Sequence, residues 1–429
     1  MTKKIIAALL VLATMLPLAV GCARAEAVDT TVTTAVTTAA TTALPRTPLP
    51  SDDMDSIFAE PAWRLSRTII KDYWTKGSLK SDLNGGTAVV WGYASFMEAM
   101  AEAYRLFPDD ANIKKAYLDS LDNGIMKYKV SNATITTPNG QTHTISYYNA
   151  GRGGKGDYYY DDDAWICIQF LNAYDLLKDE KYLKEAEETL EFLWTGWDEE
   201  LGGGIYWENF WDKKDDKGNP KVGGKNTCAN GPTAIAFLWA YQFTKNEEYL
   251  EKGKMIYDWT REVLFDKNSK LYSDSVNLKN EFNHWKSAYN QGTMIYAGAQ
   301  LYQITGDETY LKQARETNDA SIGLMFKGRG SAATMNGNPI YKSWCIGWLV
   351  RGYLKFYEVD PRKDTTAMKC MQGVLKKNLR TKNRRGYYDP YFQSGDWSGE
   401  STIDVLQPCG MSSVMSLVTY YETVLKDAK

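Results

Sequence analysis

Three consecutive aspartates, Asp161, Asp162 and Asp163, are the residues of this chain best suited to chemistry. They follow three tyrosines and open an almost wholly apolar stretch, residues 164–168. A helix N-terminus stabilises one carboxylate by about 0.3–1 kcal/mol, so a single aspartate here would be explained as a cap, with Asp161 at the N-cap. Three neighbouring charges repel one another, which offsets that gain. Capping and catalysis therefore both stay open for this cluster.

A retaining glycosidase needs two carboxyl groups about 5–5.5 Å apart, one as nucleophile and one as acid and base. Consecutive side chains inside a helix point apart, but at a helix entrance they can converge on one cavity. The carboxylate better placed against free helix N–H groups would stay ionised. Its neighbour, walled by aromatic rings, would keep its proton. The aspartate cluster thus predicts a site that cleaves sugars.

Loops rich in Gly, Asn, Asp, Trp and Tyr lead into the apolar stretches of the chain, and such long loops are usually functional. Aromatic rings suit the C–H faces of sugars, and side-chain amides bind hydroxyl groups. Core packing is the alternative for any one tryptophan, and helix capping is the alternative for an amide before a helix. On this basis we predict binding roles for Trp207, Asn226, Asn230, Asn290 and Gln291. Trp211, Trp285 and Trp397 share the polar-loop setting of Trp207.

The first residues have the charge and length of a secretory signal. Lys3 and Lys4 precede an apolar stretch, residues 5–20, which is too short for a spanning helix. Residues 19–22 resemble a bacterial lipobox, in which Cys22 would be lipidated after cleavage. We therefore expect residues 1–22 to be a signal peptide and the protein to be an exported, cell-surface lipoprotein that touches the membrane through its lipid anchor. Ordinary cleavage within residues 23–27, giving a secreted protein, is the alternative.

Composition bounds the rest of the chain. Residues 23–55 are rich in Thr, Ala and Pro and bury too little apolar surface to fold, so they predict a spacer before one domain at residues 56–429. The formal charge of −3, without a basic block, argues against nucleic acid as a partner. Two histidines, His143 and His284, are too few for a His-rich metal site. We expect no metal, no cofactor and a monomer.

An internal repeat predicts the architecture. Six apolar helical stretches each end near a tyrosine, and successive terminal tyrosines lie 51 to 70 residues apart, the length of a helical hairpin. An amphipathic helix follows, and a connector at residues 179–183 recurs in related form at 246–250 and 307–311. Six buried and six outer helices predict an all-α, single-domain (α/α)6 barrel, with an open α-solenoid as the alternative. The apolar stretches are residues 89–104, 164–174, 232–241, 292–302, 344–353 and 411–420.

Together these motifs resemble glycoside hydrolase family 76, the bacterial endo-α-1,6-mannanases and their fungal cell-wall relatives, over residues 60–425. The matching pieces are Tyr159-Tyr160-Asp161-Asp162-Asp163-Ala164-Trp165, Lys225-Asn226-Thr227 with Asn230-Gly231-Pro232, the Asp274 segment, Tyr289-Asn290-Gln291-Gly292 and, more loosely, residues 341–351. The resemblance implies an (α/α)6 barrel and a retaining mechanism, with Asp161 as nucleophile and Asp162 as acid and base. It also implies binding roles for Tyr160, Asp163, Trp165, Asp274, Tyr289 and Trp344.

The register of the catalytic pair stays open by one position. Asp163 stands where the family often has Asn or another polar residue, so Asp162 and Asp163 form the alternative pair. The resemblance implies that the substrate is α-1,6-linked mannan or manno-oligosaccharides, cut internally with net retention.

Three other functions compete with mannan hydrolysis. The first is transglycosylation of mannan-type glycans, and the second is glycan binding by a non-catalytic surface lipoprotein. Sugar epimerases and unsaturated-uronide hydrolases share the predicted architecture. The epimerases use histidine bases, however, and neither His143 nor His284 lies at an acidic helix entrance.

Overall fold

The computed structural model describes residues 54–210, 213–215, 217–336, 342–393 and 403–425, and the structural statements that follow concern these residues. Cys22, Trp211 and Trp397 lie outside them. Twelve α-helices dominate the described part of the chain. No helix there is both long and apolar enough to cross a membrane.

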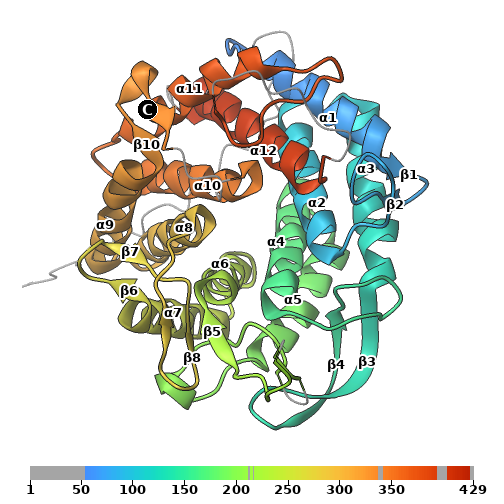
Figure 1. The fold of residues 1–429 in the computed structure, drawn as a ribbon, viewed down its shortest axis with the longest axis vertical. Coiled ribbons are helices and arrows are strands. Elements are labelled where there is room, and N and C mark those ends of the chain that lie inside the picture. Colours follow the sequence, from blue (N-terminus) through green and yellow to red (C-terminus); the bar gives the residue numbers. More distant parts are fainter. Residues whose placement is uncertain (1–53, 211–212, 216, 337–341, 394–402, 426–429) are drawn as a thin grey trace, which may run out of the picture. The chain divides into compact units, whose positions relative to one another are not determined.

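All six apolar stretches form helices, and most of their residues are buried. Each helix packs against the next one along the chain, and the last packs back against the first, so the ring is closed (Figure 1). Closure confirms the predicted barrel over the open solenoid. The inner helices are α2 (Val90–Leu106), α4 (Tyr160–Leu177), α6 (Thr227–Thr244), α8 (Ala288–Thr305), α10 (Ser343–Val359) and α12 (Leu406–Tyr420).

Six outer helices cover this ring. Five of them pack against the inner helix that precedes them, whereas the first packs against α12 and so covers the point where the ring closes. Their amphipathic character explains this position, because one apolar stripe faces the inner helices and the charged residues face outward. They are α1 (Ala59–Tyr73), α3 (Ala111–Asp119), α5 (Glu180–Trp194), α7 (Glu247–Val263), α9 (Glu308–Met325) and α11 (Thr366–Asn378).

The repeated connector joins the C-terminal cap of an inner helix to the N-terminal cap of the next outer helix. Helices α4, α6 and α8 each end in a residue with left-handed backbone, at Lys178, Lys245 and Gly306. The next residue, Asp179, Asn246 or Asp307, caps the following outer helix by accepting a backbone N–H with its side chain. These turns are short, so the inner and outer helix of each pair lie antiparallel.

Every described strand lies in a connection from an outer helix to the next inner helix. The short stop-and-start turns lie at the other end of the barrel, so the strands and long loops surround the N-terminal ends of the inner helices. The pairs are β1 (Trp74–Thr75) with β2 (Ser78–Leu79), β3 (Lys129–Thr136) with β4 (Thr142–Tyr148), β6 (Phe265–Asp266) with β7 (Leu271–Tyr272), β10 (Phe326–Lys327) with β11 (Thr334–Met335), and β5 (Gly224–Asn226) with β8 (Ser275–Asn277) and β9 (Phe282–Asn283).

The fourth residue of four inner helices fastens the preceding strand region to the helix. In each case a buried side-chain oxygen accepts a backbone N–H from the connection before the helix, and we call these residues the anchors. The repeat is chemical and not a matter of sequence identity, because the four side chains differ. The bonds are Leu79 N to Tyr93 (2.9 Å), Tyr148 N to Asp163 (2.8 Å), Ile205 N to Asn230 (2.7 Å) and Tyr272 N to Gln291 (2.8 Å).

Candidate active site

The entrance of α4 is held in place by its first residue. The Tyr160 N–H donates to the Trp207 carbonyl at 2.9 Å. The Tyr160 ring is fully buried and stacks on Phe192 with ring centroids 4.9 Å apart, and its hydroxyl lies 3.2 Å from the Thr195 hydroxyl. Tyr160, predicted as a substrate contact, is thus a core residue that fixes where α4 begins.

Asp161 and Asp162 are the second and third residues of α4, and both are partly exposed. The N-cap is Tyr159, so neither aspartate caps the helix, and both lie within its regular first turn. The Asp161 carboxylate accepts hydrogen bonds from the Asp162 N–H and from the side chains of Trp207 and Cys228. Asp161 is therefore oriented by the N–H of its neighbour and by two side chains from other parts of the chain.

Electrostatics separate the two carboxyl groups. Burial raises the pKa of Asp161 to about 6, although its hydrogen bonds from Trp207, the Asp162 N–H and Cys228 act in the opposite direction. Burial raises the pKa of Asp162 well above its usual value, and the adjacent Asp161 charge raises it further. The Asp161 charge thus favours the protonated form of Asp162, whereas the hydrogen bonds to Asp161 favour its own ionised form. This is the division expected of a nucleophile and an acid.

Asp163 differs from both. It is fully buried, its Oδ1 accepts the Tyr148 N–H, and its Oδ2 has no partner among the described residues. Burial raises the pKa of Asp163 well above its usual value, so the side chain is held neutral. As the anchor of α4, Asp163 joins the β3–β4 hairpin to the helix that carries the pair.

One wall of the site comes from paired strands that lie far apart in sequence. β5 pairs with β8, which places Asn226 opposite Ser275, and the Thr227 N–H donates to the Asp274 carbonyl at 2.8 Å. The Asp274 carboxylate accepts from the Asn290 amide at 3.3 Å and from the Asn283 amide at 3.1 Å. Burial raises the pKa of Asp274, against these two bonds.

The buried Cys228 thiol links this wall to the pair. Burial raises the pKa of Cys228, and the charges of Asp161 and Asp274 raise it further, so both carboxyl groups lie close to the thiol. Asp161, Asp274, Asn226 and Asn290, all predicted from sequence, therefore belong to one site.

A second part of the site is an aromatic surface. Trp344 lies edge-on to Trp165, with ring centroids 5.2 Å apart, and contacts Tyr289 at 5.7 Å. It is also edge-on to Trp91 at 5.0 Å, and Trp91 is 36% exposed. Sequence reasoning missed Trp91. Its position as the second residue of α2 matches that of Trp344 in α10, and that match was the available signal.

A buried ion-pair network supports this aromatic surface from inside the barrel. Trp348 contacts Trp165 with centroids 4.7 Å apart and donates its indole N–H to Glu98 at 3.0 Å. Arg351 binds Glu98 at 2.6 Å and Glu102 at 3.1 Å. Burial raises the pKa of Glu98 to about 7, against the Arg351 charge. These partners are about 250 residues apart in sequence, so the network could not be predicted.

Two amides that we predicted to bind substrate serve as anchors. Asn230 is fully buried, and its amide N–H groups bond to the carbonyls of Ile205 at 2.9 Å and Asn226 at 2.8 Å. Gln291 is also fully buried and bonds to the Tyr272 carbonyl at 3.0 Å. The polar atoms of both side chains bond to backbone groups. The two residues therefore position the backbone around the site and do not point into it.

The described residues hold no group of three or more His, Cys, Asp or Glu side chains that could bind a metal ion. Trp285, from the loop before α8, is partly exposed, and its indole N–H has no partner within the described ranges.

Comparison with known proteins gives a matching family and several relatives. The model of glycosyl hydrolase family 76 matches residues 62–422. The mannan endo-1,6-alpha-mannosidase DCW1 of Candida glabrata is 29% identical over 173 residues, which are 39% of this chain and 34% of that protein. DCW1 of Saccharomyces cerevisiae is 26% identical over 148 residues, 33% of this chain and 31% of that protein. The matched segments thus span about a third of each yeast protein.

Solved structures share the fold at low sequence identity. An alpha-mannanase of Bacteroides thetaiotaomicron is 22% identical, with a TM-score of 0.74, over 87% of this chain and 98% of that one. An alpha-1,6-mannanase of Salegentibacter is 23% identical, with a TM-score of 0.66, over 84% of this chain and 99% of that one. The Salegentibacter protein is an inactive variant, with two consecutive aspartates changed to asparagine, in complex with alpha-1,6-mannotriose.

Proposed function

Because this chain belongs to glycosyl hydrolase family 76, we propose that it is a retaining glycosidase that cleaves α-1,6-mannosidic bonds within mannan chains. The observation that carries the proposal is the Asp161–Asp162 pair: adjacent, partly exposed, and with unequally raised pKa values. The yeast relatives named for this activity and the Salegentibacter variant with its paired aspartates support the substrate and the residues.

In the first step, the ionised Asp161 carboxylate attacks the anomeric carbon of one mannose. Asp162 gives its proton to the glycosidic oxygen, so the leaving chain departs as a neutral alcohol. The sugar is then held on Asp161 as an ester. Hydrogen bonds from Trp207 and Cys228 orient the attacking carboxylate. These bonds weaken as the carboxylate loses its negative charge, which adds to the activation free energy of the attack.

In the second step, the roles of the neighbouring carboxyl group reverse. Asp162, now ionised, accepts a proton from a water molecule that attacks the same carbon and displaces Asp161. Two inversions give net retention. An acceptor sugar in place of water would give transglycosylation by the same residues.

Substitution of each aspartate by asparagine tests the proposal. We expect Asp161→Asn and Asp162→Asn to lose at least about a thousand-fold in cleavage of linear α-1,6-mannan, because each removes one of the two required groups. Asp163→Asn is the matched control, since asparagine keeps the oxygen that accepts the Tyr148 N–H. Full activity of either of the first two variants would overturn the assignment. So would loss of activity in Asp163→Asn together with retained activity in Asp161→Asn.

Product stereochemistry provides the second measurement. NMR early in the reaction should show the α-anomer at the new reducing end, before mutarotation. A β-anomer would rule out the retaining mechanism even if both aspartates prove essential.

A further inference from the structure

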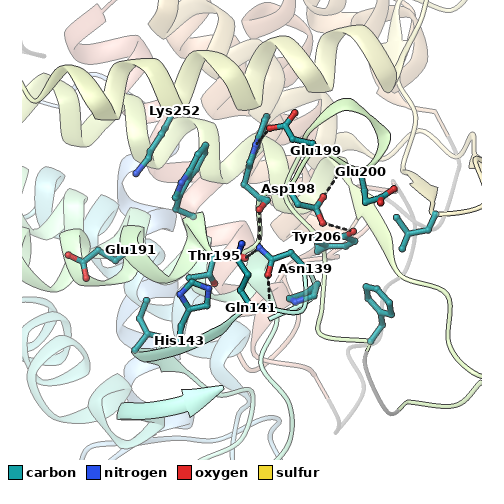
Figure 2. A pocket seen from close by; sticks show the side chains of 16 residues that line it. Asn139, Gln141, His143, Glu191, Thr195, Asp198, Glu199, Glu200, Tyr206 and Lys252 are labelled. Carbon is teal, nitrogen blue, oxygen red and sulfur yellow. Dashed lines mark hydrogen bonds between the residues drawn. The ribbon is translucent and has the colours of Figure 1, made fainter. Parts of the chain in front are cut away.

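A large open cavity lies beside the active site, on the other side of one strand-like segment. Its volume is about 1120 Å³, slightly above the range of about 300–1,000 Å³ that is usual for small-molecule sites. We call it the hairpin pocket, because the β3–β4 hairpin forms one wall, the end of α5 and residues 195–200 form a second, and Lys252 of α7 lies at its edge (Figure 2).

Residues 205–208 separate the hairpin pocket from the aspartate pair. Tyr206 lines the pocket and donates its hydroxyl to Asp198 at 3.0 Å, whereas the next residue, Trp207, hydrogen-bonds to Asp161. The residues described as lining the pocket include neither Trp207 nor the aspartates, so it is a cavity distinct from the active site.

The pocket contains a fixed aromatic surface. Trp194 and Trp197 are both partly exposed, and their rings stack with centroids 5.3 Å apart and planes at 12°. The Lys252 ammonium lies 4.7 Å from the centre of the Trp194 ring, and the Trp197 indole donates to Glu199 at 3.2 Å. Rings held in this way lose little conformational entropy when a ligand binds.

Some polar side chains around the rings make no hydrogen bond to other described residues. Gln141 and Glu191 are exposed, and no side-chain hydrogen bond occupies either of them within the described ranges. His143 Nε2 is buried without a partner in the described part of the chain. Figure 2 shows Gln141 and His143 on the hairpin side and Glu191 on the helix side. Gln141 on the hairpin wall and Glu191 on the helix wall can therefore bind hydroxyl groups of a ligand.

The charge of the lining selects the ligand class. Glu191, Glu199 and Glu200 are exposed acids, while Lys252 is already paired with Glu248 at 2.6 Å. An acidic lining disfavours phosphate, sulfate and acidic polysaccharides. A neutral sugar, with an apolar ring face and many hydroxyl donors, matches both the stacked rings and the carboxylates.

We propose that the hairpin pocket is a second carbohydrate-binding site, which holds a neutral oligosaccharide segment of the polymer cleaved at the aspartate pair. The sugar class rests on the proposed function. Binding at this pocket raises the local concentration of polymer at the active site, so it acts on long chains and not on short ones.

The double variant Gln141→Ala/Glu191→Ala tests the site, because both side chains are exposed and their removal spares the core. We expect KM for polymeric α-1,6-mannan to rise by about five-fold and kcat/KM for α-1,6-mannotriose to stay unchanged. Glu251→Ala, an exposed acid on α7 outside the pocket, is the matched control and should change neither value. Equal KM values for the double variant and the wild type would overturn the proposal.

Retardation in native gels that contain mannan separates this proposal from the proposed activity. We expect the cleavage-deficient Asp161→Asn/Asp162→Asn protein to be retarded, and the further Gln141→Ala/Glu191→Ala change to reduce that retardation. If the wild type does not cleave mannan, the proposed activity fails, while retardation that depends on Gln141 and Glu191 still supports the pocket. If the Gln141→Ala/Glu191→Ala change leaves the retardation unaltered, the proposed second binding site is refuted, whether or not the wild type cleaves mannan.

Discussion

At the aspartate pair, the titrations of two neighbouring carboxyl groups are coupled. The charge of Asp161 favours a proton on Asp162, and hydrogen bonds from Trp207 and Cys228 favour the ionised form of Asp161. The same two side chains would thus define both the nucleophile and the acid. A change at either aspartate must shift the titration of the other.

The pH profile should show this coupling. The nucleophile must be ionised, so kcat/KM is expected to rise with pH as Asp161 loses its proton near pH 6, the value to which burial raises the pKa of Asp161. The acid must be protonated, so kcat/KM falls again at higher pH as Asp162 ionises. With an activated aryl mannoside, which needs no acid, Asp162→Asn should lose the alkaline fall. Retention of that fall would contradict the assignment of Asp162.

Residue chemistry was predictable where it depended on neighbours in the chain. The Asp161–Asp162 pair, Trp207, Asn226, Asp274 and Tyr289 lie near one another in the structure, and their binding or catalytic roles stay predictions. Asn290 and Trp344, which were predicted with them, are buried. Asn230 and Gln291 were predicted as ligand contacts but are buried anchors. A side-chain amide before an apolar helix suits both roles, and only the position of the preceding strand region distinguishes them.

At the scale of elements, the anchors connect the shape of the site to the barrel. Asn230 donates to and accepts from the backbone of Ile205, which starts the segment that carries Trp207. Gln291 does the same for Tyr272, two residues before Asp274. Each anchor therefore sets the distance between an inner helix and one wall of the active site.

Loss of an anchor should cost stability and activity together. Asn230→Ala leaves the Ile205 N–H and carbonyl buried without partners, at about 1–3 kcal/mol for each group. We expect a lower midpoint of thermal unfolding and a reduced kcat through the displaced Trp207. Asn226→Ala, at a partly exposed neighbour, should raise KM with little effect on thermal unfolding. Equal unfolding midpoints for the two variants would argue against the anchor role.

The ion-pair network below the aromatic surface makes a separate prediction. Glu98→Gln leaves Arg351 buried with Glu102 as its remaining acid, and breaking such a pair typically costs about 3–5 kcal/mol. Because Trp348 bonds to Glu98 and contacts Trp165, the variant should also bind mannotriose more weakly. Trp348→Phe keeps a smaller aromatic ring and loses the hydrogen bond without leaving Arg351 short of an acid, so a smaller effect is expected. Thermal unfolding measures the change in stability, and titration calorimetry measures the change in affinity for mannotriose.

Element types and order were predictable, because helix periodicity and the repeated connector are local signals. The repeated tyrosine now has a reason. Tyr174, Tyr241 and Tyr302 donate to the glutamates that open the next outer helix, at 3.2, 3.4 and 3.3 Å. The short strands between helices were not predicted. Apart from β3 and β4, these strands are two or three residues long, which leaves too little alternation to detect in a sequence.

At the scale of the whole molecule, the barrel is closed by the two ends of the described chain. Helix α1 packs against α12, and the buried Ser66 and Ser412 hydroxyls lie 2.8 Å apart. The Tyr73 hydroxyl donates to the Ile403 carbonyl at 2.8 Å. Closure of the barrel was predicted from the number of repeats. These particular contacts were not predicted, because no sequence pattern in either segment identifies the other as its partner.

Removal of α12 should therefore abolish the fold. Deletion of residues 406–429 exposes the apolar faces of α1, α2 and α10, and we expect no cooperative thermal transition by circular dichroism. The double variant Ser66→Ala/Ser412→Ala removes both partners of the closing hydrogen bond and keeps α12, so it should unfold close to the wild-type temperature. A cooperative transition in the deletion variant would mean that the remaining helices form an independent domain.

The closing contact also sets an order of events during synthesis. Ser66 and Ser412 are 346 residues apart, so the first helix waits for almost the entire polypeptide before it meets its partner. Contacts between such distant positions form slowly. Arg351 must likewise arrive before Glu98 is neutralised and the tryptophans above it are supported. A nascent or truncated chain would accordingly carry both aspartates long before it could use them.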